Sequence, residues 1–206
     1  MSEPEEKFCQ KFVLESDAIE GIGPLPDDVR STDGHEAIIV SLDELARAKQ
    51  YRFTESDICY IQYKIVFEQH LKPGGLKLKQ KYIGRYRDCT VYVGNRLCPA
   101  PASVPSMMKR LIEDVGVWQD LIRSVRKSFS AEQLIPQIAD FHLDYEHIHP
   151  FADGNGRSGR ALVYYLFRFA DLQPFIFTSN DRRETYYPAF AGRELMRDYF
   201  LKKYKG

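Results

Sequence analysis

A glycine-rich segment of twelve residues lies between two runs with helical periodicity, and this arrangement constrains the fold more than any other feature of the chain. Before the segment, apolar and aromatic residues recur at three- and four-residue steps through 130–148. After it, the same spacing continues from Ala161 to Phe169 and stops at Asp171. Each run predicts an amphipathic helix, so residues 149–160 must form a short loop that leads into the second helix.

Helical spacing also predicts most of the remaining chain. The further helices are expected at Glu36–Tyr51, at Thr54–His70, at Val104–Trp118 and from Arg182 to near the C-terminus. The exception is Leu76–Val93, which is rich in Tyr, Val, Ile and Thr and predicts a β-hairpin. A chain of 206 residues with 44% hydrophobic composition can bury one good core. We therefore expect a mainly α fold that carries one hairpin.

Composition excludes several classes of function. The 29 basic residues balance the 29 acidic ones, so no net charge attracts the chain to nucleic acid or to an anionic membrane. The first ten residues lack the basic and apolar regions of a signal peptide, and no apolar run reaches the ~20 residues of a spanning helix. Cys9, Cys59, Cys89 and Cys98 are scattered without a C-x-x-C pair. We expect a cytoplasmic protein without disulfides, zinc, nucleic acid or membrane partners.

The glycines of the loop point to an anion site. Gly154, Gly156 and Gly159 allow unusual backbone angles and let a ligand approach the main chain. Because a helix begins here, unpaired N–H groups and the positive end of the helix dipole face the same space, as in phosphate sites. Arg157 and Arg160 lie three residues apart and can both hold phosphate oxygens. Two arginines favour a polyphosphate.

Two further residues add chemistry to this anion site. Asp153 is compatible with bound phosphates if a Mg²⁺ ion lies between them. His149 precedes the loop and can accept a proton near neutral pH, as activation of a hydroxyl nucleophile requires.

Each of these features has an alternative reading when taken alone. A glycine–asparagine turn commonly starts a helix, an aspartate before a helix commonly caps it, and two arginines can form a solvated face. A degraded P-loop over 154–161 is disfavoured, because arginine replaces the lysine, alanine replaces the hydroxyl residue and a helix precedes it. A metal pair of His147 and His149 lacks a third ligand nearby. The convergence of base, acid, glycines and cations favours a reactive site.

Residues 149–160 resemble the signature H-x-F-x-[DE]-G-N-G-R-x-x-R of the Fic family at every specified position. The segment GRYRDCTVYVG, residues 84–94, resembles the family's flap hairpin, and 183–187 resembles its tyrosine-bearing segment behind the adenine pocket. The resemblance covers about 54–204. It implies a Fic fold, a helical bundle with a β-hairpin flap over the active site, and transfer of AMP from ATP to a Ser, Thr or Tyr hydroxyl of a target protein.

The resemblance assigns roles to the motif residues. It makes His149 the general base and Phe151 the core anchor of the loop, with Asp153 holding Mg²⁺ against the α- and β-phosphates. Asn155, with the amides of Gly154 and Gly156, would cradle phosphate. The β- and γ-phosphates would be held by Arg157 and Arg160.

The resemblance also assigns the residues around the motif. The flap, including Val93, Gly94, Asn95 and Arg96, would bind the target segment by strand addition. Tyr187, with Tyr186 as a second aromatic side chain, would stack on the adenine. Some relatives carry asparagine seven residues after the stacking tyrosine, where this chain has Glu194, so the selectivity for the base stays open.

Gly156 bears on the group that is transferred. Doc-type kinases resemble this motif but carry lysine at that position and transfer the γ-phosphoryl group, so glycine favours AMP transfer. The alternatives on the same scaffold are UMP, phosphoryl or phosphocholine transfer, and a non-catalytic interaction module.

The segment SDAIEG, residues 16–21, resembles the inhibitory motif [ST]-x-x-x-E-[GN] of Fic proteins with an N-terminal inhibitory helix. The alternative is that Glu20-Gly21 only ends a helix. A glutamate in a last turn faces the negative end of the dipole, so a cation partner is expected, and Arg160 is the one we predict. Ser16 would cap or bond near Asn155. The resemblance therefore divides the chain into an N-terminal inhibitory region, 1–53, and a Fic core, 54–206, which form one compact unit. Removal of AMP and a homodimer are two further expectations that come from relatives.

Overall fold

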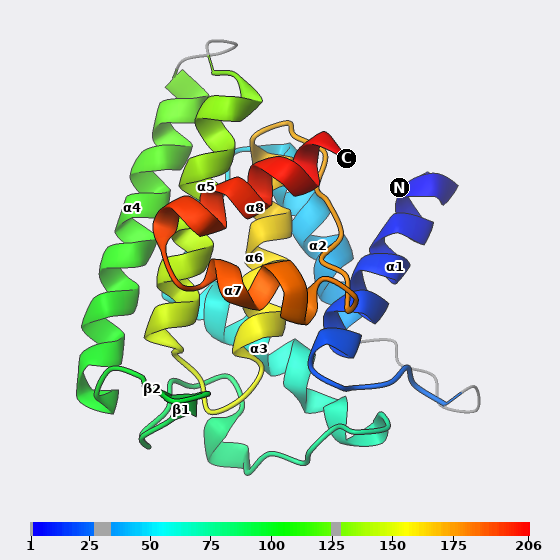
Figure 1. Cartoon of the computed structure of the whole chain (residues 1–206), viewed down its shortest axis with the longest axis vertical. Helices are drawn as coiled ribbons and strands as arrows, with labels where there is room; N and C mark the ends of the chain where they lie inside the picture. Colours follow the sequence, from blue (N-terminus) through cyan, green and yellow to red (C-terminus); the bar gives the residue numbers. More distant parts are fainter. Residues whose placement is uncertain (1, 27–33, 125–128) are drawn as a thin grey trace.

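The computed structural model describes residues 2–26, 34–124 and 129–206, and it is a helical bundle with one small sheet (Figure 1). Its α-helices are α1 (Glu3–Ile19), α2 (His35–Ala48), α3 (Glu55–Phe67), α4 (Val104–Ser124), α5 (Ala131–Ile148), α6 (Asn155–Phe169), α7 (Tyr187–Ala189) and α8 (Arg193–Lys205). The shorter elements are the turns η1 (Gln69–Leu71), η2 (Gln80–Tyr82), η3 (Pro101–Ser103) and η4 (Arg182–Tyr186) and the antiparallel strands β1 (Tyr92–Val93) and β2 (Arg96–Leu97). The predicted mainly α architecture is confirmed.

The centre of the bundle is α6. Every residue of this helix is buried except Gly156 and Arg168, which are partly exposed. It contacts α1, α2, α3 and α5, while α8 packs across α5 (Figure 1). A helix that is buried on all sides has its position fixed by its neighbours. The loop at its N-terminus, which carries the sequence motif, is therefore held by several elements at once.

Capping residues decide where the predicted helices begin and end. Thr54 precedes α3 and its Oγ1 accepts a hydrogen bond from the Asp57 N–H, and the Gln133 side chain accepts one of 2.9 Å from the Ser130 N–H at the start of α5. Lys49 adopts a left-handed conformation with φ 53°, so α2 ends at Ala48 rather than at the predicted Tyr51. α3 ends at Phe67, before the predicted His70, and α4 runs past the predicted Trp118 to Ser124.

The prediction of a hairpin over Leu76–Val93 is wrong in extent. Only Tyr92 and Val93 form a strand, and they pair with Arg96 and Leu97 beyond the predicted segment. The preceding residues form a loop whose backbone is held by side chains instead of by a second strand. Gln62 Oε1 accepts a hydrogen bond of 2.6 Å from the Gly84 N–H, and Arg87 donates to the Cys89 carbonyl at 2.9 Å. Tertiary contacts here outweigh the β propensity of the sequence.

The C-terminal region also differs from the single predicted helix. The chain forms the π-helical turn η4 and the short α7 before it breaks at Gly192 and continues as α8. With this break, Tyr186 packs inward against Phe177, whose ring in turn contacts Phe200, and all three rings are buried. Burial of these rings outweighs the backbone bonds that one continuous helix would have added.

The predictions about disulfides and about membrane-spanning helices can be compared with the structure. The four cysteines form no disulfide in the described residues. Among the helices of the described residues, none has the length and apolar composition that a bilayer crossing requires.

Candidate functional site

The loop between α5 and α6 has a fixed shape. α5 ends at Ile148, the next residue His149 turns the chain with φ 51°, and Gly154 with φ 82° precedes α6. A Cβ on Gly154 would lie 2.6 Å from Val66 Cγ1, so glycine is needed for both angle and space. Phe151 is fully buried against Tyr86, as predicted for a core anchor. The N-terminus of α6 therefore directly follows a loop whose shape these backbone angles and contacts define.

The side chain of Asn155 closes this loop. Its Oδ1 accepts a hydrogen bond of 2.8 Å from the Phe151 N–H, and its Nδ2 donates one of 2.9 Å to the Phe151 carbonyl. It is buried, with 2% of its surface exposed. The amide side chain is therefore already used within the loop, and the expectation that Asn155 cradles phosphate stays a prediction for its backbone N–H.

His149 is held from the main-chain side. Arg87 is buried and its Nε donates a hydrogen bond of 2.7 Å to the His149 carbonyl. Burial lowers the pKa of the His149 imidazole to about 4, and the positive charges of Arg96 and Arg87 act in the same direction. The ring is therefore neutral at pH 7 and able to accept a proton. This is the charge state that a general base needs.

Asp153 and Arg157 share one amide between them. Gln69 Nε2 donates to Asp153 Oδ2 at 2.9 Å, and Gln69 Oε1 accepts from Arg157 Nη2 at 2.6 Å. Asp153 Oδ1 also accepts the Gly154 N–H at 2.7 Å. The Nε of Arg157 is buried without a partner. The guanidinium thus keeps an unused donor near the start of α6.

The residues present fit a magnesium ion of the kind that is shared with substrate. The Asp153 side chain is 39% exposed and has accepted two hydrogen bonds, so oxygen lone pairs remain. No group of three or more His, Cys, Asp or Glu side chains within the described ranges could hold a metal ion by itself. Mg²⁺ is commonly bound by one or two carboxylates together with phosphate oxygens. Asp153 next to an anion site matches that pattern.

Arg160 is buried and turned towards α1. Its Nη2 donates to Glu20 Oε1 at 2.8 Å and to the Ser16 carbonyl at 2.8 Å, and its Nε donates to Ser16 Oγ at 2.9 Å. The predicted pairing of Glu20 with Arg160 is therefore present in the structure. Ser16 bonds this same arginine, and the expectation that it bonds near Asn155 is not met.

The Glu20 carboxylate also covers the first turn of α6. A Cβ on Gly156 would lie 2.3 Å from Glu20 Oε1. α1 can bring its last residues this close because Gly21 turns the chain with φ 74° directly after Glu20. A side-chain anion thus occupies the position at the helix N-terminus where a phosphate oxygen would otherwise be attracted.

The two adjacent tyrosines have different environments. Tyr187 is 40% exposed, and Arg182 lies over its ring and donates to its hydroxyl at 3.0 Å. Tyr186 is buried and its hydroxyl lies 2.8 Å from His142 Nε2. The prediction that Tyr186 stacks on a base is wrong for this structure, because its ring is part of the core. Glu194 is exposed and paired with Arg197 at 2.7 Å.

The predicted flap is the hairpin β1–β2 with Gly94 and Asn95 at its turn. The residues of both strands and of the turn between them are exposed, and strand addition by a target stays a prediction. Arg96 anchors the hairpin to the end of α5 by donating to the carbonyls of Glu146 and His147, each at 3.1 Å. These bonds also satisfy carbonyls at a helix C-terminus.

Sequence reasoning missed the side chains that support the site. Gln69 and Arg87 are buried polar residues in segments that were interpreted only by their helical or strand pattern. Gln62 lies among the apolar residues of α3, and its Nε2 donates to the Asp153 carbonyl at 3.1 Å. A polar residue at an apolar helix position was the signal available for it. The partners of these residues lie far away in sequence, so spacing gave no indication of them.

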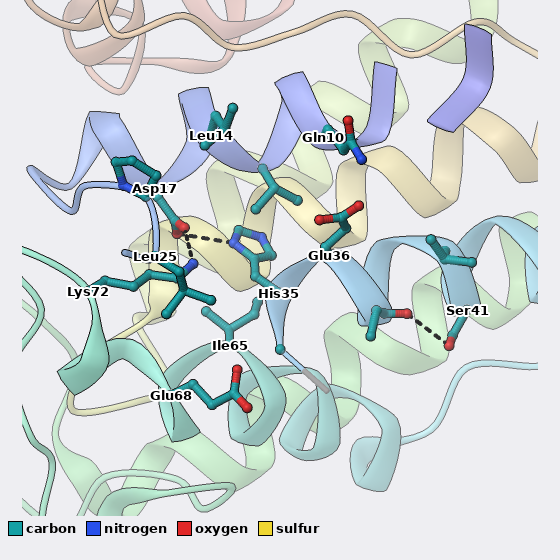
Figure 2. Close-up of a pocket in the computed structure, with 15 residues that line it drawn as sticks. Gln10, Leu14, Asp17, Leu25, His35, Glu36, Ser41, Ile65, Glu68 and Lys72 are labelled. Atoms are coloured by element: carbon teal, nitrogen blue, oxygen red, sulfur yellow. Dashed lines mark hydrogen bonds and ion pairs between the residues drawn. The ribbon is translucent and has the colours of Figure 1, made fainter. Parts of the chain in front are cut away.

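A second buried cluster lies near the C-terminal end of α1. Asp17 accepts a hydrogen bond of 2.6 Å from Lys72 and lies 3.1 Å from the ring nitrogen of His35 (Figure 2). The cluster borders an open cavity of about 710 Å³ between α1, α2 and the end of α3. The bond between Asp17 and Lys72 attaches the end of α1, next to Ser16 and Glu20, to the segment after η1.

Comparisons with known proteins agree with this geometry. A sequence model of the Fic/DOC family matches residues 52–175. A curated protein adenylyltransferase Fic from Culex quinquefasciatus is 33% identical over 104 residues, which is 50% of this chain and 19% of the relative. The chain therefore spans about a fifth of the length of the curated relatives that it matches.

Solved structures share the fold at low identity. Fic-1 from C. elegans superposes with a TM-score of 0.72 and 19% identity, covering all of this chain and 61% of that one. BepC from Bartonella tribocorum, solved with bound AMPPNP, gives a TM-score of 0.55 and 16% identity, covering 82% of this chain and 83% of that one. Since the family match extends over more than half of the residues, the chain belongs to the Fic/DOC family.

Proposed function

We propose that this chain transfers AMP from ATP to a Ser, Thr or Tyr hydroxyl of a target protein. The observation that carries the proposal is a neutral imidazole, His149, beside a helix N-terminus that is opened by Gly154 and Gly156 and flanked by Arg157 and Arg160. Such an arrangement serves a reaction in which a hydroxyl attacks a bound polyphosphate.

The proposed step is balanced in atoms and charge. The hydroxyl oxygen forms a bond to the α-phosphorus and gives its proton to Nε2 of His149. The bond from the α-phosphorus to the oxygen that bridges to the β-phosphorus breaks, and pyrophosphate leaves. Arg157 and Arg160 hold the charge that develops on the leaving group, and positioning of the two reactants supplies the rest. A Mg²⁺ ion held by Asp153 would neutralise phosphate charge.

Two comparisons support AMP as the transferred group. The curated relatives are named protein adenylyltransferases, and the BepC structure carries an ATP analogue. The chain also has Gly156 where the Doc-type kinases described above carry lysine, and Glu20 Oε1 lies in the space that a Cβ at this position would take. We propose further that Tyr187 lies against the adenine, because it is the exposed ring of the pair.

We propose that residues 1–53 inhibit the core through α1. In the inhibited form Glu20 bonds Arg160 and lies over the start of α6, so the γ-phosphate of ATP loses a cation and meets a carboxylate. A chain with α1 in this position binds ATP weakly or in an unproductive pose. Movement of α1 away from the core then allows activity. In this position the carboxylate of Glu20 would also direct the removal of AMP.

The experiment is incubation of the full chain with ATP and magnesium, followed by intact-mass measurement of the chain and of candidate targets. The Glu20→Gly variant should gain adducts of about 329 Da, the mass of AMP, and the wild type far fewer. An adduct of about 80 Da would instead indicate phosphoryl transfer, which would overturn the proposal.

Two controls make the result specific. Glu6→Gly places the same change at an exposed position in the first turn of α1 and should behave as wild type. Glu20→Gly/His149→Ala should lose the adducts while keeping ATP binding. If the double variant retains them, His149 is not the base.

A further inference from the structure

Two buried polar atoms at the C-terminal end of α5 lack hydrogen-bond partners. They are Nδ1 of His149 and Oε1 of Glu146. The other carboxyl oxygen, Glu146 Oε2, is 3.8 Å from the same His149 Nδ1. A buried donor or acceptor left unpaired costs about 1–3 kcal/mol, so these unpaired groups are expected to bond with a small side-chain rotation.

The main chain offers Nδ1 a poorer partner. The carbonyl of Glu146 is close enough to affect the imidazole, but it already accepts a hydrogen bond of 3.1 Å from Arg96. The carboxyl group has no such competitor at Oε1. The carboxyl oxygens of Glu146 are therefore the acceptors with free capacity beside this ring.

Gly159 makes the space for this carboxyl group. A Cβ at position 159 would lie 2.3 Å from Glu146 Oε1 and 3.0 Å from the Tyr145 ring. Gly159 is on α6 and Glu146 on α5, so the missing side chain of one helix accommodates the acid of the other. Position 159 is one of the unspecified positions of the motif, and its packing against Glu146 explains why this chain has glycine there.

We propose that Glu146 is a positioning residue, which binds Nδ1 of His149 and thereby sets whether Nε2 is free to take the proton of the target hydroxyl. The inference rests on the proposed function of His149 as the base. Under this proposal Glu146 controls whether His149 can act as the base, and the contact of Glu20 with Arg160 affects Glu146 in turn.

The chemistry depends on one shared proton. An ionised Glu146 accepts the Nδ1–H of His149, so Nε2 keeps its lone pair and can take the proton of the hydroxyl. The carboxylate then stabilises the imidazolium that forms. A protonated Glu146 donates to Nδ1 instead, which places the ring proton on Nε2 and blocks base catalysis. Loss of one proton from the pair thus switches the base on.

The charged groups around Glu146 decide when this proton is lost. Burial raises the pKa of Glu146 to about 8, the charge of Arg160 on α6 opposes this, Glu20 on α1 raises it further, and Arg96 on β2 lowers it. Tyr145 and Tyr186 also face the group. Removal of Glu20 takes away a negative charge and frees Arg160, and both changes favour ionised Glu146. Release of α1 therefore clears the phosphate site and readies the base together.

The experiment is nitrogen-15 NMR of the histidine side chains in the full chain, with His149 assigned by its Ala variant. In Glu20→Gly the neutral His149 ring should change from the Nε2–H to the Nδ1–H tautomer as pH rises, with a midpoint below about 8, the value expected with Glu20 in place. The wild type should show the same change at higher pH. A tautomer that stays constant with pH in both proteins would overturn the proposal, and this readout needs no transfer activity.

Kinetics in the Glu20→Gly background test the same idea. Glu146→Gln should lower kcat by about 10- to 100-fold, leave the KM for ATP unchanged and abolish the rise of kcat with pH. Glu146→Asp keeps the charge and should retain a rise with pH. Glu132→Gln, at the exposed start of α5, is the matched control and should change nothing.

The outcomes separate the two proposals. If no variant transfers AMP while the tautomer still follows pH as stated, the proposed function fails and the control of His149 by Glu146 stands. If Glu146→Gln keeps the full kcat and its rise with pH, the positioning role fails and the AMP transferase stands. Should Glu146→Gln not fold, the tautomer of the Glu20→Gly chain alone decides.

Discussion

The carboxylate of Asp17 accepts a hydrogen bond of 2.6 Å from Lys72, and both side chains are largely removed from solvent. This bond ties the end of α1 to the segment after η1, and the Gly23 N–H adds a bond of 2.7 Å to the Pro73 carbonyl in the same place. Gln69, in η1, bonds Arg157. The helix that we propose to be inhibitory and the proposed phosphate site therefore share one support.

Loss of one partner of this buried pair should destabilise the fold. Lys72→Met leaves Asp17 as a buried carboxylate without its cation, and this should lower the free energy of unfolding by about 3–5 kcal/mol in urea titrations. Lys81→Met breaks the exposed pair with Asp88 and should leave the free energy of unfolding almost unchanged. Equal effects of the two variants would show that Asp17–Lys72 is not a stabilising contact.

The stability of the chain should fall in acid partly through Asp17. Burial alone would raise the pKa of the Asp17 carboxyl, but the charges and hydrogen bonds of His35 and Lys72 outweigh it and hold the pKa below the ordinary value of 3.8. A lowered folded-state pKa stabilises the chain above the unfolded pKa, and this contribution is lost as pH falls below it. Urea unfolding between pH 6 and 3 (roughly the range in which carboxylates titrate) should therefore show a steeper loss for wild type than for Asp17→Asn. Parallel curves would contradict this assignment.

The packing of Gly159 predicts a large effect for a small change. In Gly159→Ala the new methyl group meets the Glu146 carboxyl and the Tyr145 ring, so the free energy of unfolding should fall by about 1–3 kcal/mol. Gly192→Ala is the matched control, because nothing lies within 4 Å of its added Cβ. Thermal unfolding of both variants measures the difference, and an unchanged melting temperature for Gly159→Ala would refute the tight packing.

The two tyrosines should separate binding from stability. In the Glu20→Gly background, Tyr187→Ala should weaken ATP binding by about 1–3 kcal/mol, the usual value of one stacked base. Tyr186→Phe should leave ATP binding unchanged but lower the free energy of unfolding by about 1–3 kcal/mol, because His142 Nε2 loses its buried partner. Calorimetric titration and urea unfolding measure the two quantities. Normal ATP affinity in Tyr187→Ala would mean that the adenine binds elsewhere.

Much of the fold could be predicted from local sequence. The run of apolar residues through 130–148 predicts α5 within a residue, and the spacing that continues to Phe169 predicts where α6 ends. These predictions succeed because helix periodicity and capping involve residues within one or two turns of each other. The motif from His149 to Arg160 was equally readable, since its chemistry lies in twelve consecutive positions.

Predictions failed where distant groups competed for a backbone or a side chain. The residues from Leu76 have the composition of strands, yet Gln62 and Arg87 hold their backbone as a loop. Tyr186 has an aromatic ring that could stack on a base, yet burial against Phe177 places this ring in the core. Neither outcome is visible in sequence spacing, because burial depends on which surfaces meet in three dimensions.

The sequence by itself determined the two helices that flank the glycine-rich loop, the motif within that loop and the family of this chain, because each depends on residues that are neighbours along the backbone. The tertiary structure alone decided which partners those residues obtain. It brings Glu20 to Arg160 across 140 positions, Gln69 between Asp153 and Arg157, and the Glu146 carboxyl into the space left by Gly159. Contacts of this kind follow from how helices pack, and packing is fixed only when all the buried faces of the bundle are satisfied together.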